Sequence, residues 1–171
     1  MKPIFPLGFA LAALVALPIG LSPVTSGPAA AHEAKAGALT IIHPMARATL
    51  PNRPMALYMA ISNDGSAPDR LLSANSPQFD AIEIHESKEQ NGVMTMVQLE
   101  AIEAPAEDTA LLEPGGLHLM LFGAKKHFKE GDEFPVTLMF ENAGAVDVTV
   151  KVEKAGHGDH SHHSGHGEAT N

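Results

Sequence analysis

Two histidines and two methionines are the residues of this chain whose types and spacing point most directly to chemistry. His85, Met96, His118 and Met120 follow the pattern histidine, ten residues, methionine, twenty-one residues, His-x-Met. Thioether sulfur is soft and binds hard cations poorly, and its combination with imidazole favours Cu(I). The chain has no cysteine, which rules out a disulfide framework and the thiolate of a blue-copper electron-transfer site. The set predicts a Cu(I) site.

Strict apolar alternation predicts how these ligands are positioned. In the strand predicted from Leu117 to Leu121, every second residue is a leucine that enters the core, so His118 and Met120 share the opposite face. By the same reasoning His85 faces outward, while Ile82 and Ile84 are buried. Met94 and Met96 share one face of the next strand.

The turn between the strands that carry His85 and Met96 decides their pairing. A four-residue loop from Glu89 to Gly92 places His85 directly opposite Met96. A two-residue Asn91-Gly92 turn shifts that pairing, and the sequence leaves both arrangements open.

A lone outward histidine or methionine on a strand is usually an ordinary surface residue. Methionine also fills gaps in cores, which is the expected role of Met55, Met59 and Met139. His43 is expected to be structural, and His127 a solvated loop residue. Four soft ligands on the outward faces of neighbouring strands are much harder to explain as coincidence.

Beyond its four-residue pattern, the sequence resembles the periplasmic copper chaperone family called PCu(A)C, whose signature has the same residues at the same intervals. The likeness runs from about Ala36 to Glu153, and Met45 stands where the family commonly has an aromatic residue. It includes His43-Pro44, Ala46-Arg47-Ala48-Thr49, Glu83-Ile84-His85-Glu86, Asn91-Gly92-Val93-Met94 and Pro114-Gly115-Gly116-Leu117-His118-Leu119-Met120. The resemblance implies delivery of copper to the dinuclear copper site of cytochrome c oxidase, with thiol-containing assembly factors as further partners.

Short strands separated by turn residues predict an all-β sandwich or barrel. No segment has a convincing helical period; Glu33 to Ala38 is expected to be a loose lead-in, and Ala104 to Thr109 to hold a turn. The family resemblance narrows the fold to a cupredoxin-like Greek-key β-sandwich in a single domain. The predicted strands are Leu39–Ile42, Ala56–Ser62, Ala81–His85, Val93–Leu99, Leu117–Leu121, Val136–Phe140 and Val146–Val152.

Both ends of the chain differ from the domain between them, which we place at residues 32–154. Residues 1–31 have the positive start, apolar stretch and Ala29-Ala30-Ala31 cleavage site of a signal peptide, which predicts export to the periplasm. Without a cysteine after that site, no lipid anchor is expected. Residues 155–171 predict a disordered tail that binds Cu(II) as an auxiliary site, with a solubilising tail or a purification tag as the alternatives. The tail histidines are His157, His160, His162, His163 and His166.

Charge and motifs exclude several classes of function. The formal net charge is −9, which gives no basic surface for nucleic acid or anionic lipid. The sequence contains no phosphate-binding glycine loop, nucleophile elbow or HExxH motif, so an enzyme is not expected. The favoured hypothesis is a periplasmic Cu(I) carrier. The alternatives are a copper sequestration or resistance protein and a periplasmic interaction module that binds no metal.

Overall fold

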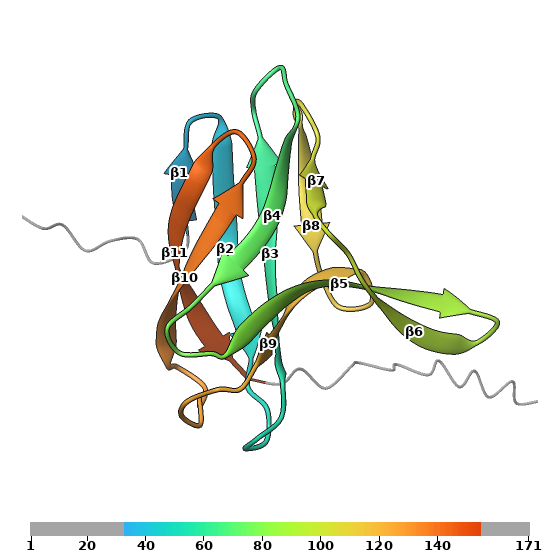
Figure 1. The fold of residues 1–171 in the computed structure, drawn as a ribbon, viewed down its shortest axis with the longest axis vertical. Helices are drawn as coiled ribbons and strands as arrows, with labels where there is room; N and C mark the ends of the chain where they lie inside the picture. Colours follow the sequence, from blue (N-terminus) through green and yellow to red (C-terminus); the bar gives the residue numbers. More distant parts are fainter. Residues whose placement is uncertain (1–32, 155–171) are drawn as a thin grey trace, which may run out of the picture.

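The computed structural model describes residues 33–154 as one all-β domain, and these residues contain no helix. Figure 1 shows the strands, of which β5 and β6 extend away from the others. The predicted signal peptide and histidine-rich tail lie outside the described residues. The strands are β1 (Glu33–Ala36), β2 (Leu39–Arg47), β3 (Met55–Asn63), β4 (Asp69–Asn75), β5 (Ala81–Gln90), β6 (Val93–Gln98), β7 (Ile102–Ala104), β8 (Asp108–Leu112), β9 (Leu117–Phe122), β10 (Glu133–Phe140) and β11 (Gly144–Glu153).

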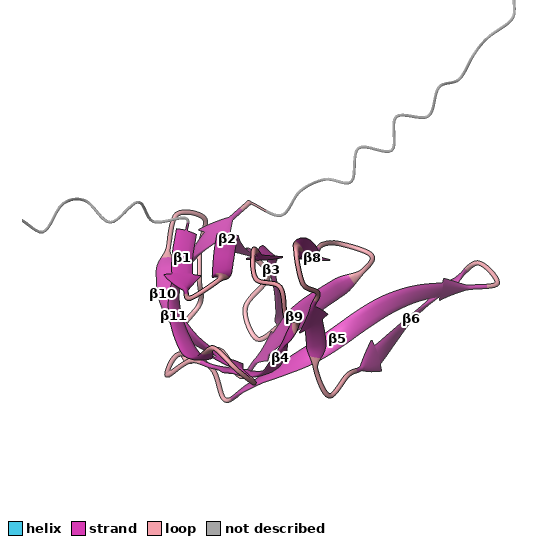
Figure 2. Ribbon diagram, turned by 90° about the horizontal axis from the view of Figure 1, so that it is seen from above, coloured by secondary structure: helices cyan, strands magenta, loops and turns pink. Residues whose placement is uncertain are grey.

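Hydrogen bonding joins the strands in the order β6-β5-β9-β8-β3-β2-β11-β10-β4-β7, with β1 added beside β2. The pairings are antiparallel except β11 with β2 and a single contact of β8 with β9. Viewed from above, the sheet curls around a central core (Figure 2). In addition, β9 pairs directly with β3 beyond the end of β8. The pairings therefore bring β5, β9 and β3 together, and these strands carry most of the candidate site.

Alternating side chains fill the core, as the sequence predicts. Leu57, Ile61, Leu119, Leu138 and Val150 are fully buried. One end of the core holds a cluster of three aromatic rings from different segments, with centroids 4.9 to 5.3 Å apart: Phe79, Phe128 and Phe134. Phe79 stacks on Phe128, and Phe134 meets both rings at steep angles. Apolar area removed from water is the main driving force for such a fold.

The predicted strands are all present, and most are longer than predicted. Four further strands, β1, β4, β7 and β8, were missed because they are short or lack clear alternation. The segment expected to be a loose lead-in forms β1 and pairs with β2. Met55 and Met59 are buried as predicted, but Met139 is 38% exposed, because it alternates with the inward-facing Leu138 and Phe140.

The β5–β6 hairpin projects from the domain because β9 pairs with only the first part of β5, from Ala81 to Glu86. Beyond that point the Ser87 N–H still binds the Gly116 carbonyl, and within residues 33–154 the rest of β5 pairs with β6. Every residue of β6 is exposed. Asn91 and Gly92 form the connecting turn with φ angles of 55° and 79°. Two consecutive positive φ angles define the tight turn that suits a two-residue hairpin loop.

Candidate metal centre

His85 and His118 meet across the pairing of β5 with β9. They are direct partners in the register, and their ring centroids lie 6.0 Å apart. Directly opposite residues share one face of a sheet. Thirty-two residues of sequence therefore separate two imidazoles that the fold places side by side.

His118 faces away from the core as predicted, yet it is only 4% exposed. The alternation itself is confirmed, since Leu119 and Leu121 are buried and Leu117 packs partly against the core. The expectation of an open outward face at His118 was wrong. The Tyr58 ring on β3, 6.3 Å away, and the His85 ring flank the imidazole.

A backbone carbonyl sets the orientation of the His118 ring. Nδ1 lies 3.0 Å from the carbonyl oxygen of Gly116, which also accepts the Ser87 N–H at 3.0 Å. A carbonyl only accepts hydrogen bonds, so Nδ1 carries the hydrogen and a neutral ring keeps its lone pair on Nε2. The preceding turn depends on Gly115, whose φ of +85° favours glycine. Hydrogen bonding from the second ring nitrogen to a carbonyl is typical of metal-binding histidines.

The His85 ring is held in a complementary way. Its Nε2 lies 2.8 Å from Oε2 of Glu83, two residues earlier on the same face, and its side chain is 13% exposed. A neutral ring that donates from Nε2 has its lone pair on Nδ1. In the described part of the protein, His85 Nδ1 is buried and has no hydrogen-bond partner. A buried nitrogen in this condition calls for a ligand, since an unsatisfied polar atom costs about 1–3 kcal/mol.

The two methionines border this histidine pair from different strands. Met120 is partly buried, two residues beyond His118, and pairs with Glu83 on β5. Met96 pairs with Ser87, so it lies diagonally from His85 on the same face. Diagonal neighbours in an antiparallel pair are about 7–8 Å apart, within reach of a long side chain. Met96 is 53% exposed.

The direct pairing of His85 with Met96 expected from a four-residue loop is wrong. His85 pairs with Gln98, because the hairpin has the shorter Asn91-Gly92 turn. The difference is two residues along β6. Side chains on a strand repeat every two residues, so Met96 stays on the face of His85.

Tyr58 lies beside His118, and Arg47 packs over the Tyr58 ring. The sequence pattern did not predict this arrangement. The Arg47 guanidinium carbon lies 5.7 Å from the Tyr58 ring centroid. Burial raises the pKa of the Tyr58 phenol, and the nearby Arg47 charge lowers it by a smaller amount. The phenol therefore stays protonated at neutral pH. Met45 pairs with Tyr58 on the side away from β9, so Tyr58 separates it from His118.

The donor set decides which ions this face suits. Within residues 33–154, no group of three or more His, Cys, Asp or Glu side chains is arranged to hold a metal ion. Hard cations and zinc usually require such groups. Two imidazoles with oriented lone pairs and two nearby thioethers instead suit a soft monovalent ion.

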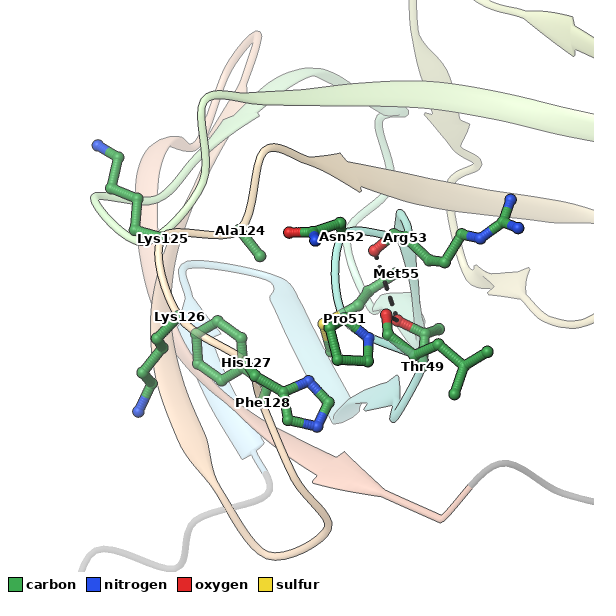
Figure 3. A pocket seen from close by; sticks show the side chains of 11 residues that line it. Thr49, Pro51, Asn52, Arg53, Met55, Ala124, Lys125, Lys126, His127 and Phe128 are labelled. Atoms are coloured by element: carbon green, nitrogen blue, oxygen red, sulfur yellow. Dashed lines mark hydrogen bonds between the residues drawn. The ribbon is translucent and has the colours of Figure 1, made fainter.

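The remaining histidines of the described domain lie elsewhere. His43 Nε2 contacts Glu153 Oε1 at 3.2 Å, in keeping with a structural role. His127 is exposed and lines a pocket of about 170 Å³ between the loop after β2 and the loop after β9. In Figure 3 the side chains of Lys125 and Lys126 point away from this pocket. It contains none of the predicted ligands, and the tail histidines His157 to His166 lie outside the described residues.

The described residues are all-β, and their likeness to a solved PCuAC domain identifies the fold as cupredoxin-like. The chain belongs to the family described as putative lipoprotein LpqE-like, which it matches over residues 39–152. A putative lipoprotein from Leifsonia xyli subsp. xyli is 32% identical over 99 residues, which are 57% of this chain and 60% of that protein. The chain thus spans less than two thirds of the length of this relative.

Solved structures give a more specific likeness. The copper-bound PCuAC domain from PmoF2 is 31% identical with a TM-score of 0.63, and the match covers 72% of this chain and 99% of that domain. Apo-DR1885 from Deinococcus radiodurans is 26% identical with a TM-score of 0.55, covering 87% and 97% of the two chains. The Cu(I) form of DR1885 is 28% identical with a TM-score of 0.50, covering 64% and 74%. The predicted fold and the resemblance to PCuAC domains are therefore confirmed.

No helix within residues 33–154 has the length and apolar composition that a membrane span requires.

Proposed function

We propose that this protein is an exported copper carrier that holds one Cu(I) ion with His85, Met96, His118 and Met120. The observation that carries the proposal is the histidine pair, in which His85 keeps a buried Nδ1 without a hydrogen-bond partner. The thioethers of Met96 and Met120 lie within side-chain reach on the same face. The similarity to the copper-bound PCuAC domain from PmoF2 and to the Cu(I) form of DR1885 supports this assignment.

Exposure at one side of the site favours carriage over storage. His85 and His118 are largely buried, whereas Met96 is more than half exposed on the projecting hairpin. An incoming ligand can therefore approach the ion from the Met96 side without opening the core. A sequestration protein is better served by four enclosed ligands.

The recipient we propose is the dinuclear copper site of cytochrome c oxidase or a related cuproenzyme. Thiol-containing assembly factors are the proposed partners in that exchange. Support for both comes from the likeness to the PCu(A)C family. Transfer is tested by mixing the Cu(I)-loaded protein with the apo copper subunit of the oxidase. Copper that stays on the carrier despite a tighter-binding acceptor would favour sequestration.

The proposal also covers the two ends of the chain. We assign residues 1–31 to a signal peptide for export to the periplasm, and residues 155–171 to an auxiliary Cu(II) site formed by the tail histidines. Residues 32–154 form the copper-binding domain between them. Deletion of residues 156–171 should remove Cu(II) binding and spare Cu(I) binding. A truncated protein with full Cu(II) capacity would assign the tail a solubilising role instead.

Anaerobic Cu(I) titration against a chromophoric chelator tests the core site. The wild-type domain should bind one equivalent, and the Met96→Ala, Met120→Leu double variant should bind much more weakly while it keeps its fold. Met139→Leu is the matched control, because Met139 is also exposed but lies on β10, remote from the site in strand order. Unchanged affinity in the double variant contradicts the assignment.

A further inference from the structure

Met94 is a second exposed thioether on the face that carries Met96. It is 57% exposed, close to the Asn91-Gly92 turn at the tip of the hairpin. Two residues along a strand correspond to about 7 Å, and side chains two apart point the same way. The two sulfur atoms therefore lie in sequence along one face, from the histidine pair toward the tip.

Packing does not account for Met94. Residues on both faces of β6 are exposed, and among the described strands it pairs only with β5. Directly across from Met94 is Glu89, an exposed carboxylate whose negative charge favours a cation nearby. Val93, Thr95 and Val97, which point to the opposite face, carry no metal-binding group. Thioether chemistry thus distinguishes the Met94 face of the hairpin from the other.

We propose that Met94 is a transfer ligand, which takes Cu(I) from the inner site and presents it at the hairpin tip to the incoming ligand of an acceptor. The inference rests on the proposed function of the four-residue site. In the step, the bonds from copper to His85, His118, Met120 and finally Met96 break, as bonds to the Met94 sulfur and to the incoming ligand of the acceptor form. Copper stays Cu(I), and this chain's released ligands take up no proton in the step, since the thioethers and the neutral imidazoles leave with their lone pairs; a thiol of the acceptor gives up its own proton as it binds.

A transfer ligand has a characteristic kinetic signature. Because it lies on the path for both entry and exit, its removal slows uptake and release by the same factor. The equilibrium affinity of the inner site then stays as it was. A fifth equilibrium ligand would instead lower the affinity when removed.

Stopped-flow exchange tests the proposal on the full chain as exported. The Cu(I)-loaded protein is mixed anaerobically with bicinchoninate, and the coloured Cu(I) complex is followed in wild type, Met94→Leu and the control Met139→Leu. Met94→Leu should slow release by at least about fivefold with less than a twofold change in Kd, because affinity and exchange rate are separable quantities. Met139→Leu should exchange at the wild-type rate.

Methyl NMR with Ag(I), a redox-inert stand-in for Cu(I), gives a second readout. The Met96 methyl signal should shift with the first equivalent of Ag(I) and the Met94 signal only beyond it, while the Met139 signal stays in place. A Met94 signal that never responds to Ag(I) would overturn the transfer role.

The outcomes separate this inference from the function on which it rests. Wild-type protein that fails to bind Cu(I) overturns both. Normal Cu(I) binding with wild-type exchange in Met94→Leu overturns the transfer role alone. A tenfold or larger loss of affinity in Met94→Leu overturns it too, because Met94 would then belong to the equilibrium site.

Discussion

The domain body and the β5–β6 hairpin differ in how far their side chains are buried. In the body, side chains such as Leu119 and Leu138 are fully buried, whereas every residue of β6 is exposed. The body therefore gives the protein its stability, and the hairpin contributes little to it. The candidate site spans the boundary, with two oriented histidines on one side and an exposed methionine on the other. The domain body holds the histidines in place, and the hairpin leaves Met96 accessible to an incoming ligand.

The largest effect expected from this comparison is on stability. Leu119→Ala, which removes a fully buried side chain, should lower the free energy of unfolding by about 2–5 kcal/mol. Val97→Ala on β6 should change it by less than about 0.5 kcal/mol. Urea unfolding of both variants measures the difference. Equal losses would mean that the hairpin packs against the body in solution.

The loss of Cu(I) affinity should be larger for a substitution in the domain body than for one in the hairpin. His118→Ala should weaken Cu(I) binding by roughly a hundredfold and Met96→Leu by about tenfold, where each tenfold is about 1.4 kcal/mol. The reason is that the imidazole is already oriented by Gly116, while the exposed Met96 side chain must be ordered on binding. Competition titrations measure both constants. A larger loss of Cu(I) affinity in Met96→Leu than in His118→Ala would contradict this prediction.

Asp69 tests the body at the end away from the hairpin. Its carboxylate accepts the N–H groups of Arg70, Asn142 and Ala143. Burial raises the pKa of Asp69, but these hydrogen bonds outweigh burial and leave the pKa below its ordinary value. Asp69→Asn should cost about 1–3 kcal/mol at neutral pH, because backbone donors lose an acceptor.

The sign of the pH effect follows from the lowered pKa. A folded-state pKa below that of the unfolded chain stabilises the fold above the unfolded value of about 4, and this stability is lost as the pH falls through the folded value. Urea unfolding at neutral and acid pH should therefore show a smaller acid loss in Asp69→Asn than in wild type. Parallel pH curves would show that Asp69 does not contribute to acid unfolding.

The smallest effect is expected at the turn of the hairpin. Gly92→Ala places a side chain at a φ of +79°, which costs about 1 kcal/mol locally. Global unfolding should barely change, because the hairpin lies outside the core. Amide hydrogen exchange should accelerate in β6 and in the outer half of β5, and stay constant in β3. Faster exchange throughout the domain would place the hairpin within the cooperative unit.

Local alternation was enough to predict on which strand faces the candidate ligands lie. It assigned Leu119 and Leu121 to the core and His118 to the other face, and these assignments are confirmed. It did not predict what covers that face, because Tyr58 approaches His118 through the pairing of β3 with β9, which no local pattern encodes. The contact between Glu83 and His85 could have been predicted from the sequence, because residues two apart on a strand lie on the same face.

The register of the hairpin and the irregular or shortest strands were the other features that could not be predicted from the sequence. Asn91-Gly92 admits more than one loop length in sequence, and only the backbone angles select the two-residue turn. Strand β4 was missed because its exposed Leu72 and buried Asp69 break the apolar alternation. Strand β7 has three residues, too few to show a period.

The pairing of β5 with β9 has a consequence for the order of folding events. His85 and His118 are far apart in the chain and meet only when these strands pair, and such non-local contacts form late. The proposed copper site therefore does not exist in an unfolded chain. Metal uptake is then confined to molecules that have finished folding, and the bound ion stabilises them by mass action. A melting temperature that rises with Cu(I) concentration in wild type, and not in His118→Ala, is the expected result.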